Sequence, residues 1–177
     1  MSGCDRHIVL LVLDADGVLT DGRITIDEKG NHVRAFDVRD GMGIRLWREA
    51  GGKTAVLSSR SCPAVAMRAR EMQVDHVLEG HDAKLPALQR LLGDLGLSVS
   101  QACFMGDDLL DLAAMQTCGY AIAVADAVPE VRAAACYVTR RAGGRGAVRE
   151  AVEHLLRRDG RWHGIASRYD SSAGRTA

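Results

Sequence analysis

Five short apolar runs, each closed by turn residues and followed by a helical pattern, constrain the fold of this chain more than any other feature. The runs are continuous rather than alternating, which is typical of strands buried on both faces of a parallel sheet. Alternation of such strands with helices predicts a doubly wound α/β fold, with a mostly parallel sheet and helices on both faces. The predicted strands are Ile8–Leu13, Thr54–Leu57, Val74–Leu78, Ala102–Met105 and Ala121–Val124.

The segments between these runs predict helices. Leu88, Leu92 and Leu95 recur at helical spacing, and Pro86 falls in the first turn, where its missing N–H has little effect. The expected helices are Gly41–Ala50, Cys62–Met72, Leu85–Leu95, Leu109–Met115, Pro129–Ala135 and Ala147–Arg157.

Two segments depart from the alternation. Between Arg23 and Phe36, apolar and polar residues alternate on both sides of a polar turn that contains Gly30, which indicates a β-hairpin. The hairpin follows the first strand, so we expect it to project from the carboxyl edge of the sheet as a flap or an oligomerisation arm. Residues 159–177 are polar and lack periodicity, which predicts a single domain over residues 1–158 followed by a flexible tail.

Composition narrows the classes of partner. Lys and Arg number 23, as do Asp and Glu, so net charge gives no reason to expect nucleic acid or an anionic membrane. No apolar run is long enough to cross a bilayer, and no signal peptide is recognisable. The five cysteines are scattered and form no C-x-x-C pair, which favours free thiols in a reducing cytoplasm over disulfides or a zinc site.

Polar side chains follow three of the predicted strands. Asp14 and Asp16 follow the first, Ser58 follows the second, and GDDLLD at 106–111 follows the fourth, while Lys84 opens a helix. The carboxyl ends of parallel strands meet at one edge of a sheet, so we expect these groups to lie together. Helix capping explains a single Ser or Asp at such a place, but it does not require two carboxylates two residues apart.

Carboxylates gathered at one site repel one another, and a divalent cation removes that repulsion. Oxygen ligands favour Mg²⁺, which shares its coordination with substrate phosphates. A lysine beside it is suited to act as a point charge on a phosphoryl oxygen. A carboxylate nucleophile, a second carboxylate for proton transfer, a hydroxyl, a lysine and an acidic pair meet the requirements of phosphoryl transfer to an aspartate.

These motifs resemble those of the haloacid dehalogenase superfamily of phosphotransferases. The matching residues are LDADGVLTDG at 13–22, Ser58, Lys84 and GDDLLD at 106–111, in the order of the superfamily. Within it, the chain is similar to the 3-deoxy-D-manno-octulosonate 8-phosphate (KDO 8-phosphate) phosphatase family, and the likeness runs from about Ile8 to Leu156. That closer likeness rests on DGVLTDG, FDVRDGMGIR at 36–45, AVADA at 123–127 and YVTRRAGGRGAVRE at 137–150.

The resemblance implies roles for individual residues. Asp14 attacks phosphorus, and Asp16 protonates the leaving alkoxide and then activates water. Ser58 and Lys84 bind the transferring phosphoryl oxygens. Ser58 stands in LSSR, where relatives commonly have threonine followed by glycine, and it keeps the hydroxyl.

The resemblance also implies a Mg²⁺ site and an assembly. The ligands would be Asp14, the backbone carbonyl of Asp16 and Asp107, with Asp108 nearby in a supporting role. The spacing of the motifs leaves no room for a cap domain, so the resemblance implies a homotetramer in which hairpins assemble and a neighbour helps to close each site. The candidate contacts for a sugar acid phosphate are Arg39, Asp40, Arg60 and Arg145.

Three alternatives remain open at this point. The substrate could be another nonulosonate phosphate, such as deaminoneuraminate 9-phosphate. A receiver module of a response regulator also phosphorylates an aspartate, but it carries its acidic pair at the first strand, whereas here that pair comes late. An inactive regulatory subunit would not need competent residues at all four motifs.

Overall fold

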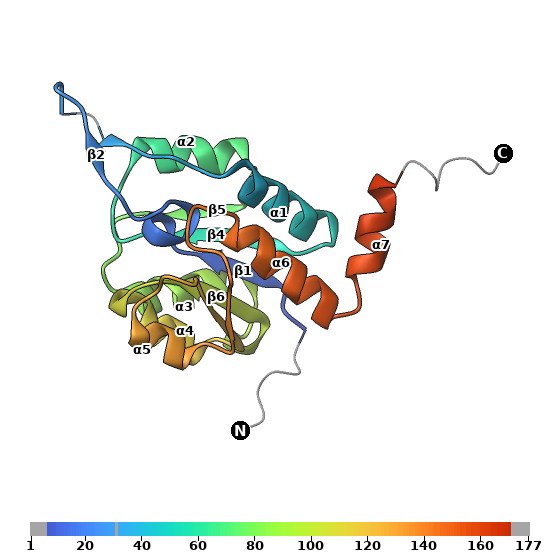
Figure 1. Cartoon of the computed structure of the whole chain (residues 1–177). Helices are drawn as coiled ribbons and strands as arrows, with labels where there is room; N and C mark the ends of the chain where they lie inside the picture. The colour runs from blue at the N-terminus through green and yellow to red at the C-terminus, as the bar shows by residue number, and fades with distance from the viewer. Residues whose placement is uncertain (1–6, 31, 171–177) are drawn as a thin grey trace.

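A six-stranded parallel sheet forms the centre of the computed structural model, which describes residues 7–30 and 32–170 (Figure 1). Its strand order is β5-β4-β1-β6-β7-β8, and every neighbouring pair is parallel. This confirms the doubly wound α/β prediction. The strands are β1 Leu10–Leu13, β4 Lys53–Leu57, β5 His76–Leu78, β6 Ala102–Gly106, β7 Tyr120–Ala123 and the unpredicted two-residue β8 Tyr137–Val138.

Helices cover both faces of the sheet. Helices α1, α2 and α6 lie on one side of it and α3, α4 and α5 on the other (Figure 1). The fourth predicted helix is split, because a 3₁₀ turn over Leu109–Asp111 precedes α4. The helices are α1 Val38–Glu49, α2 Pro63–Glu71, α3 Lys84–Leu95, α4 Leu112–Thr117, α5 Pro129–Ala134 and α6 Ala147–Arg158.

Helix α1 begins three residues before its predicted start at Gly41. The side chain of Asp37 accepts a hydrogen bond from the backbone N–H of Arg39, and this cap starts the helix at Val38. Farther along α1, a Cβ at Gly43 would lie 2.8 Å from the Cα of Arg149. Glycine at this position therefore allows α1 and α6 to pack closely, which brings the FDVRDG segment against the start of α6.

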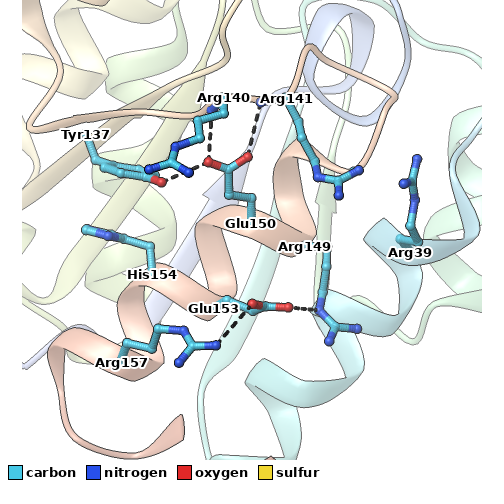
Figure 2. Close-up of a pocket in the computed structure, with 10 residues that line it drawn as sticks. Arg39, Tyr137, Arg140, Arg141, Arg149, Glu150, Glu153, His154 and Arg157 are labelled. Atoms are coloured by element: carbon cyan, nitrogen blue, oxygen red, sulfur yellow. Dashed lines mark hydrogen bonds and ion pairs between the residues drawn. The ribbon is translucent and has the colours of Figure 1, made fainter.

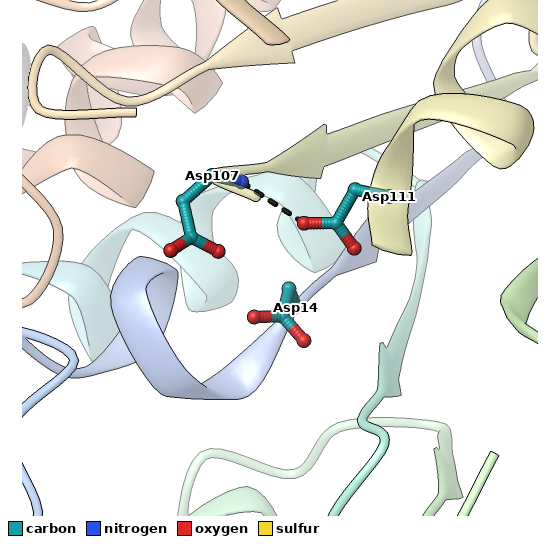
Figure 3. A group of neighbouring side chains, drawn as sticks. All are labelled: Asp14, Asp107 and Asp111. Carbon is teal, nitrogen blue, oxygen red and sulfur yellow. Dashed lines mark hydrogen bonds between the residues drawn. The ribbon is translucent and has the colours of Figure 1, made fainter. Parts of the chain in front are cut away.

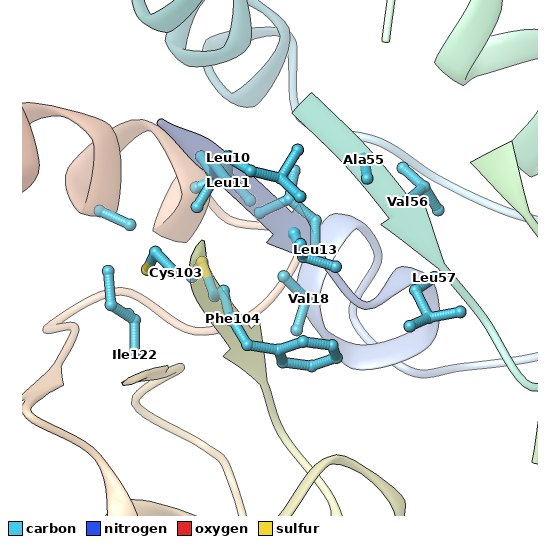
Figure 4. Packing of buried hydrophobic residues seen from close by; sticks show 14 of the residues in the cluster. Leu10, Leu11, Leu13, Val18, Ala55, Val56, Leu57, Cys103, Phe104 and Ile122 are labelled. Atoms are coloured by element: carbon cyan, nitrogen blue, oxygen red, sulfur yellow. The ribbon is translucent and has the colours of Figure 1, made fainter. Parts of the chain in front are cut away.

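The core is centred on β1, whose four residues are all buried. Figure 4 shows their side chains between those of β4 and β6, with Phe104 packed against Val18 below the first strand. Burial on both faces explains why the run was continuous rather than alternating. Among the described cysteines, Cys62, Cys103, Cys118 and Cys136 are free thiols.

The predicted hairpin is present and projects away from the sheet (Figure 1). Strand β2 (Thr25–Ile26) pairs antiparallel with β3 (His32–Val33), and Gly30 has a φ of 80° in the turn. Residue 31 of the predicted turn lies outside the described residues. The apolar side chains of the hairpin are exposed, with Ile26 at 61% and Val33 at 51%.

The segment after residue 158 corrects a prediction. Instead of a flexible tail from 159 onwards, residues Trp162–Ala166 form α7 and Ser167–Tyr169 a 3₁₀ turn. Ile165 is buried, and the guanidinium of Arg157 lies 4.6 Å from the Trp162 ring centroid. A few aromatic and aliphatic anchors therefore order a segment whose average composition is polar. The part of the tail beyond 170 lies outside the described residues, and in the described part no helix has the length and apolar character to span a bilayer.

Candidate active site

A small cavity of about 160 Å³ lies at the carboxyl edge of the sheet. It is lined by residues that follow β1, β4 and β6 and by the first residue of α3. All four predicted catalytic residues and Asp107 line it, as does Arg60. The lining residues are Asp14, Asp16, Ser58, Ser59, Arg60, Lys84, Asp107, Asp108, Leu110 and Asp111.

Asp14 is fixed at the tip of β1. Its backbone N–H donates to the carbonyl of Met105, so the ladder with β6 extends one residue beyond the strand. The chain then turns sharply through Ala15–Leu19, where Gly17 has a φ of 102°. A Cβ at Gly17 would also overlap the Asp107 carboxylate, so glycine is required here both for backbone conformation and for space.

Lys84 joins the carboxylates of two different strand ends. Its Nζ donates to Asp14 Oδ1 and to Asp111 Oδ1, each at 2.5 Å, and all three side chains are nearly inaccessible to solvent. Burial alone would lower the pKa of Lys84, but the two carboxylates outweigh it and raise that pKa above its ordinary value. Lys84 is therefore a fixed positive charge beside Asp14.

Three carboxylates face one another across the cavity (Figure 3), with one oxygen each from Asp14, Asp107 and Asp111 within 4.8 Å of the others. Burial and the charge of Asp111 raise the pKa of Asp14 to about 6, against the opposing effect of Lys84. Burial and the charges of Asp14 and Asp111 raise the pKa of Asp107 to about 8. One ammonium does not balance three carboxylates, so this all-oxygen donor set fits a hard divalent cation such as Mg²⁺.

Asp111 is a residue whose role the sequence did not reveal. While its Oδ1 accepts from Lys84, its Oδ2 accepts from the backbone N–H groups of Asp107 (3.0 Å) and Asp108 (3.3 Å). These contacts hold the turn that presents Asp107. An acidic residue three positions after Asp108, at the start of a helix, is a capping-box signal that could have indicated this.

The carboxylate of Asp16 has different partners from that of Asp14. Its Oδ1 accepts from Nε of Arg34 at 2.7 Å, and Nε of Arg60 lies 3.9 Å from its Oδ2. Nothing in the sequence indicated Arg34, which comes 18 residues later on the hairpin. Ser58 is buried at 3% exposure, and its Oγ accepts from the backbone N–H of Arg60 at 3.2 Å. Ser58 and Asp16 thus line the same cavity as Asp14.

The other predicted substrate contacts lie elsewhere in this chain, which corrects their placement. Asp40 is 1% exposed, and its two carboxylate oxygens accept from the N–H groups of Gly146 (3.2 Å) and Arg149 (2.9 Å). It therefore caps α6 and does not line the cavity. Burial raises the pKa of Asp40. Arg145 reaches outward, where its guanidinium lies 3.5 Å from Asp21.

Arg39 borders a separate concavity of about 780 Å³ beside α6 (Figure 2). Its guanidinium pairs with Asp37, and Figure 2 shows it across from Arg149. The two cavities share no lining residue. The larger one is lined by Arg39, Tyr137, Arg140, Arg141, Gly146, Arg149, Glu150, Glu153, His154 and Arg157.

The sequence matches a known family over most of the sheet. Residues 44–151 fit the family of haloacid dehalogenase-like hydrolases. The chain belongs to this family. The 3-deoxy-D-manno-octulosonate 8-phosphate phosphatase of Escherichia coli K12 is 41% identical over 88% of this chain and 83% of the relative. The phosphatase of the same name from Yersinia pestis is 40% identical over 85% and 80%.

Solved structures of this hydrolase family extend the likeness to the whole fold. The KDO 8-phosphate phosphatase of Moraxella catarrhalis, solved with magnesium, phosphate and KDO, superposes with a TM-score of 0.90 and 36% identity, covering 93% of this chain and 94% of that one. The cobalt-bound deoxy-D-mannose-octulosonate 8-phosphate phosphatase of Haemophilus influenzae gives 0.87 and 35%, covering 95% and 96%.

Proposed function

We propose that this haloacid dehalogenase-like hydrolase is a Mg²⁺-dependent phosphatase that converts KDO 8-phosphate to KDO and phosphate. The observation that carries the proposal is the Asp14–Lys84 contact at the tip of β1, in a cavity that Asp16 and Asp107 also line. Relatives and solved structures that carry this activity in their names cover more than four-fifths of the chain.

The chemistry follows from the positions of the side chains. Asp14 has a pKa of about 6, so at neutral pH it is mainly the carboxylate that a nucleophile must be. Its oxygen forms a bond to phosphorus as the bond from phosphorus to the sugar oxygen breaks. Asp16 gives its proton to that leaving oxygen, so the sugar departs as an alcohol.

The second step restores the enzyme. A water oxygen attacks the phosphorus of the aspartyl-phosphate, Asp16 takes the proton from that water, and Asp14 is released with inorganic phosphate as product. Ser58 and Lys84 bind phosphoryl oxygens through both steps and offset their charge. Mg²⁺, which Asp14, Asp107 and the backbone carbonyl of Asp16 would hold, supplies further positive charge against the phosphoryl group.

We also propose that the protein is a homotetramer and that it is located in the cytoplasm. The hairpin carries exposed apolar side chains at Ile24, Ile26 and Val33, and a two-stranded hairpin is marginal in water on its own. Leu110 is 54% exposed and lines the cavity. A homotetramer in which hairpins pack together, and in which a neighbour covers Leu110 and closes the site, would bury these surfaces. Reduced thiols such as Cys103 suit the cytoplasm.

A panel of phosphate monoesters tests the substrate. Phosphate release is measured with Mg²⁺ for KDO 8-phosphate, deaminoneuraminate 9-phosphate and a neutral sugar phosphate. We expect the highest kcat/KM for the eight-carbon acid. A clear preference for the nine-carbon acid would contradict the assignment, and stable protein-bound phosphate without release would indicate a receiver-like module.

A further inference from the structure

The Arg34 side chain is buried on a hairpin that is otherwise exposed. The Arg34 side chain is 1% exposed, whereas its neighbour Val33 is 51% exposed. The side chain folds back over the site, where Nε donates to Asp16 Oδ1 at 2.7 Å and Nη2 to Asp16 Oδ2 at 3.4 Å. The two residues thus make a bidentate pair between the hairpin and the cavity.

This pair determines how the Asp16 carboxylate is held. Asp14 is fixed by Lys84 and by the sheet ladder, but Asp16 lies in the turn after β1 with a non-helical backbone (φ −81°, ψ 109°). Its carboxylate contacts Arg34 and, at 3.9 Å, Arg60. A buried guanidinium is stable only when paired, and a bidentate fork fixes direction as well as distance.

We propose that Arg34 is a positioning residue for Asp16, and that through it the hairpin sets the efficiency of proton transfer to the leaving group. This inference rests on the proposed phosphatase function. A general acid must be within hydrogen-bond reach of the oxygen that it protonates, so a freely rotating Asp16 would protonate that oxygen less often. The hairpin then has a chemical role as well as a place in assembly.

Leaving-group dependence tests this role. The value of kcat/KM reports the steps up to departure of the alcohol, and a sugar alkoxide needs a proton, whereas 4-nitrophenolate leaves without one. For Arg34→Ala we expect kcat/KM with KDO 8-phosphate to fall by about 10- to 100-fold, which is less than the full contribution of a general acid, about 10²–10⁴-fold, because Asp16 is still present. With 4-nitrophenyl phosphate, we expect a change of less than about threefold.

Two conservative variants and a control sharpen the comparison. Arg34→Lys keeps the positive charge, whereas Arg34→Gln keeps only a neutral hydrogen-bond donor. Because the partner is a carboxylate, we expect Arg34→Lys to retain more activity on KDO 8-phosphate than Arg34→Gln. If Arg34→Ala does not fold, these two variants carry the test. Arg23→Ala removes an exposed arginine of the same hairpin that makes no ion pair with another described residue, and we expect it to match wild type on both substrates.

The outcomes separate this inference from the function on which it rests. An equal fall on both substrates would mean that Arg34 supports phosphate binding or the fold, and no fall on either would mean that Asp16 needs no such support. Either result overturns the inference while leaving the phosphatase assignment intact. A wild-type protein inactive on both substrates would overturn the function and the inference together.

Discussion

Lys84 and Asp14 are 70 residues apart in the sequence, yet Lys84 Nζ lies 2.5 Å from Asp14 Oδ1 in a buried site. The same ammonium contacts Asp111 at 2.5 Å, so one cation links the ends of β1 and β6 to the start of α3. Removing one partner of such a buried contact leaves uncompensated charge, which is strongly destabilising. Lys84 should therefore affect both the stability of the fold and the activity of the site.

Replacing Lys84 with Met keeps most of the side-chain volume and removes the charge. We expect the free energy of unfolding of the metal-free protein at pH 8 to fall by about 3–5 kcal/mol, since Asp14 and Asp111 lose their partner. We expect kcat to fall at least about 100-fold, the usual loss when a group that stabilises the transition state is removed. Urea unfolding and phosphate release measure the two effects.

The matched control is Lys29→Met, which removes an exposed lysine from the hairpin turn. It should change the free energy of unfolding by less than about 0.5 kcal/mol, as is usual for surface positions. Equal stability of the Lys84 and Lys29 variants would contradict the buried role given to Lys84.

Stability should depend on pH and Mg²⁺ together. Folding raises the pKa of Asp14 from 3.8 to about 6 and that of Asp107 from 3.8 to about 8. A carboxyl with a raised folded-state pKa destabilises the fold increasingly as pH rises from its unfolded pKa towards its folded one. Through these groups, the metal-free protein should lose stability between about pH 4 and pH 8.

Thermal unfolding with EDTA or with Mg²⁺ checks this sign. Mg²⁺ bound to the ionised carboxylates opposes this loss of stability, so the rise in Tm on adding Mg²⁺ should be larger at pH 8 than at pH 5.5. Each additional kcal/mol of stabilisation by Mg²⁺ at pH 8 should add about 2–4 °C to that rise. In Asp107→Asn, the rise should shrink at pH 8. A Mg²⁺ effect of the same size at both pH values would contradict the shifted pKa values.

Asp111→Asn tests the residue that holds the turn before α4. The amide oxygen of Asn can accept either from Lys84 or from the N–H groups of Asp107 and Asp108. Its NH₂ group then faces the other set of donors and cannot accept from them. We expect a fall of about 1–3 kcal/mol in the free energy of unfolding, the cost of unsatisfied buried groups. The exposed Asp94→Asn on α3 is the control, and indistinguishable unfolding of the two variants would show that Asp111 is not needed there.

Much of this site could be predicted because its geometry depends on strand order. Asp14, Ser58 and Asp107 each follow a buried strand, and parallel strands necessarily bring their carboxyl ends together. The pairing of Asp16 with Arg34 could not be predicted, since it depends on how a hairpin side chain folds back across the cavity.

Other features of the fold could not be predicted from the sequence because of their small size or their polar composition. Strand β8 has only two residues, too few to show a pattern. Helix α7 is anchored by Trp162 and Ile165 within a polar segment, so its average composition resembles that of a tail. Asp40 in the FDVRDG segment was expected to meet substrate, but a carboxylate that caps a distant helix has the same appearance in sequence.

The proposed assembly can be tested at the hairpin. Ile26 is 61% exposed, and Ile26→Asp would place a charge at a packed hairpin interface. We expect light scattering to show a lower mass for this variant and a loss of phosphatase activity at equal concentration. Val99→Asp, at the amino edge of the sheet before β6, should keep the mass of the wild type. A wild-type protein that is already monomeric would contradict the assembly.

The central claim is that Asp14 is the nucleophile of a Mg²⁺-dependent phosphatase. Phosphate release from KDO 8-phosphate by wild type and by Asp14→Asn, each with Mg²⁺ and with EDTA, tests it most directly. The nearly isosteric amide should abolish release, because it cannot form the acyl phosphate, while folding is checked by thermal unfolding. We predict activity only for wild type with Mg²⁺; full Mg²⁺-dependent activity in Asp14→Asn would contradict the mechanism.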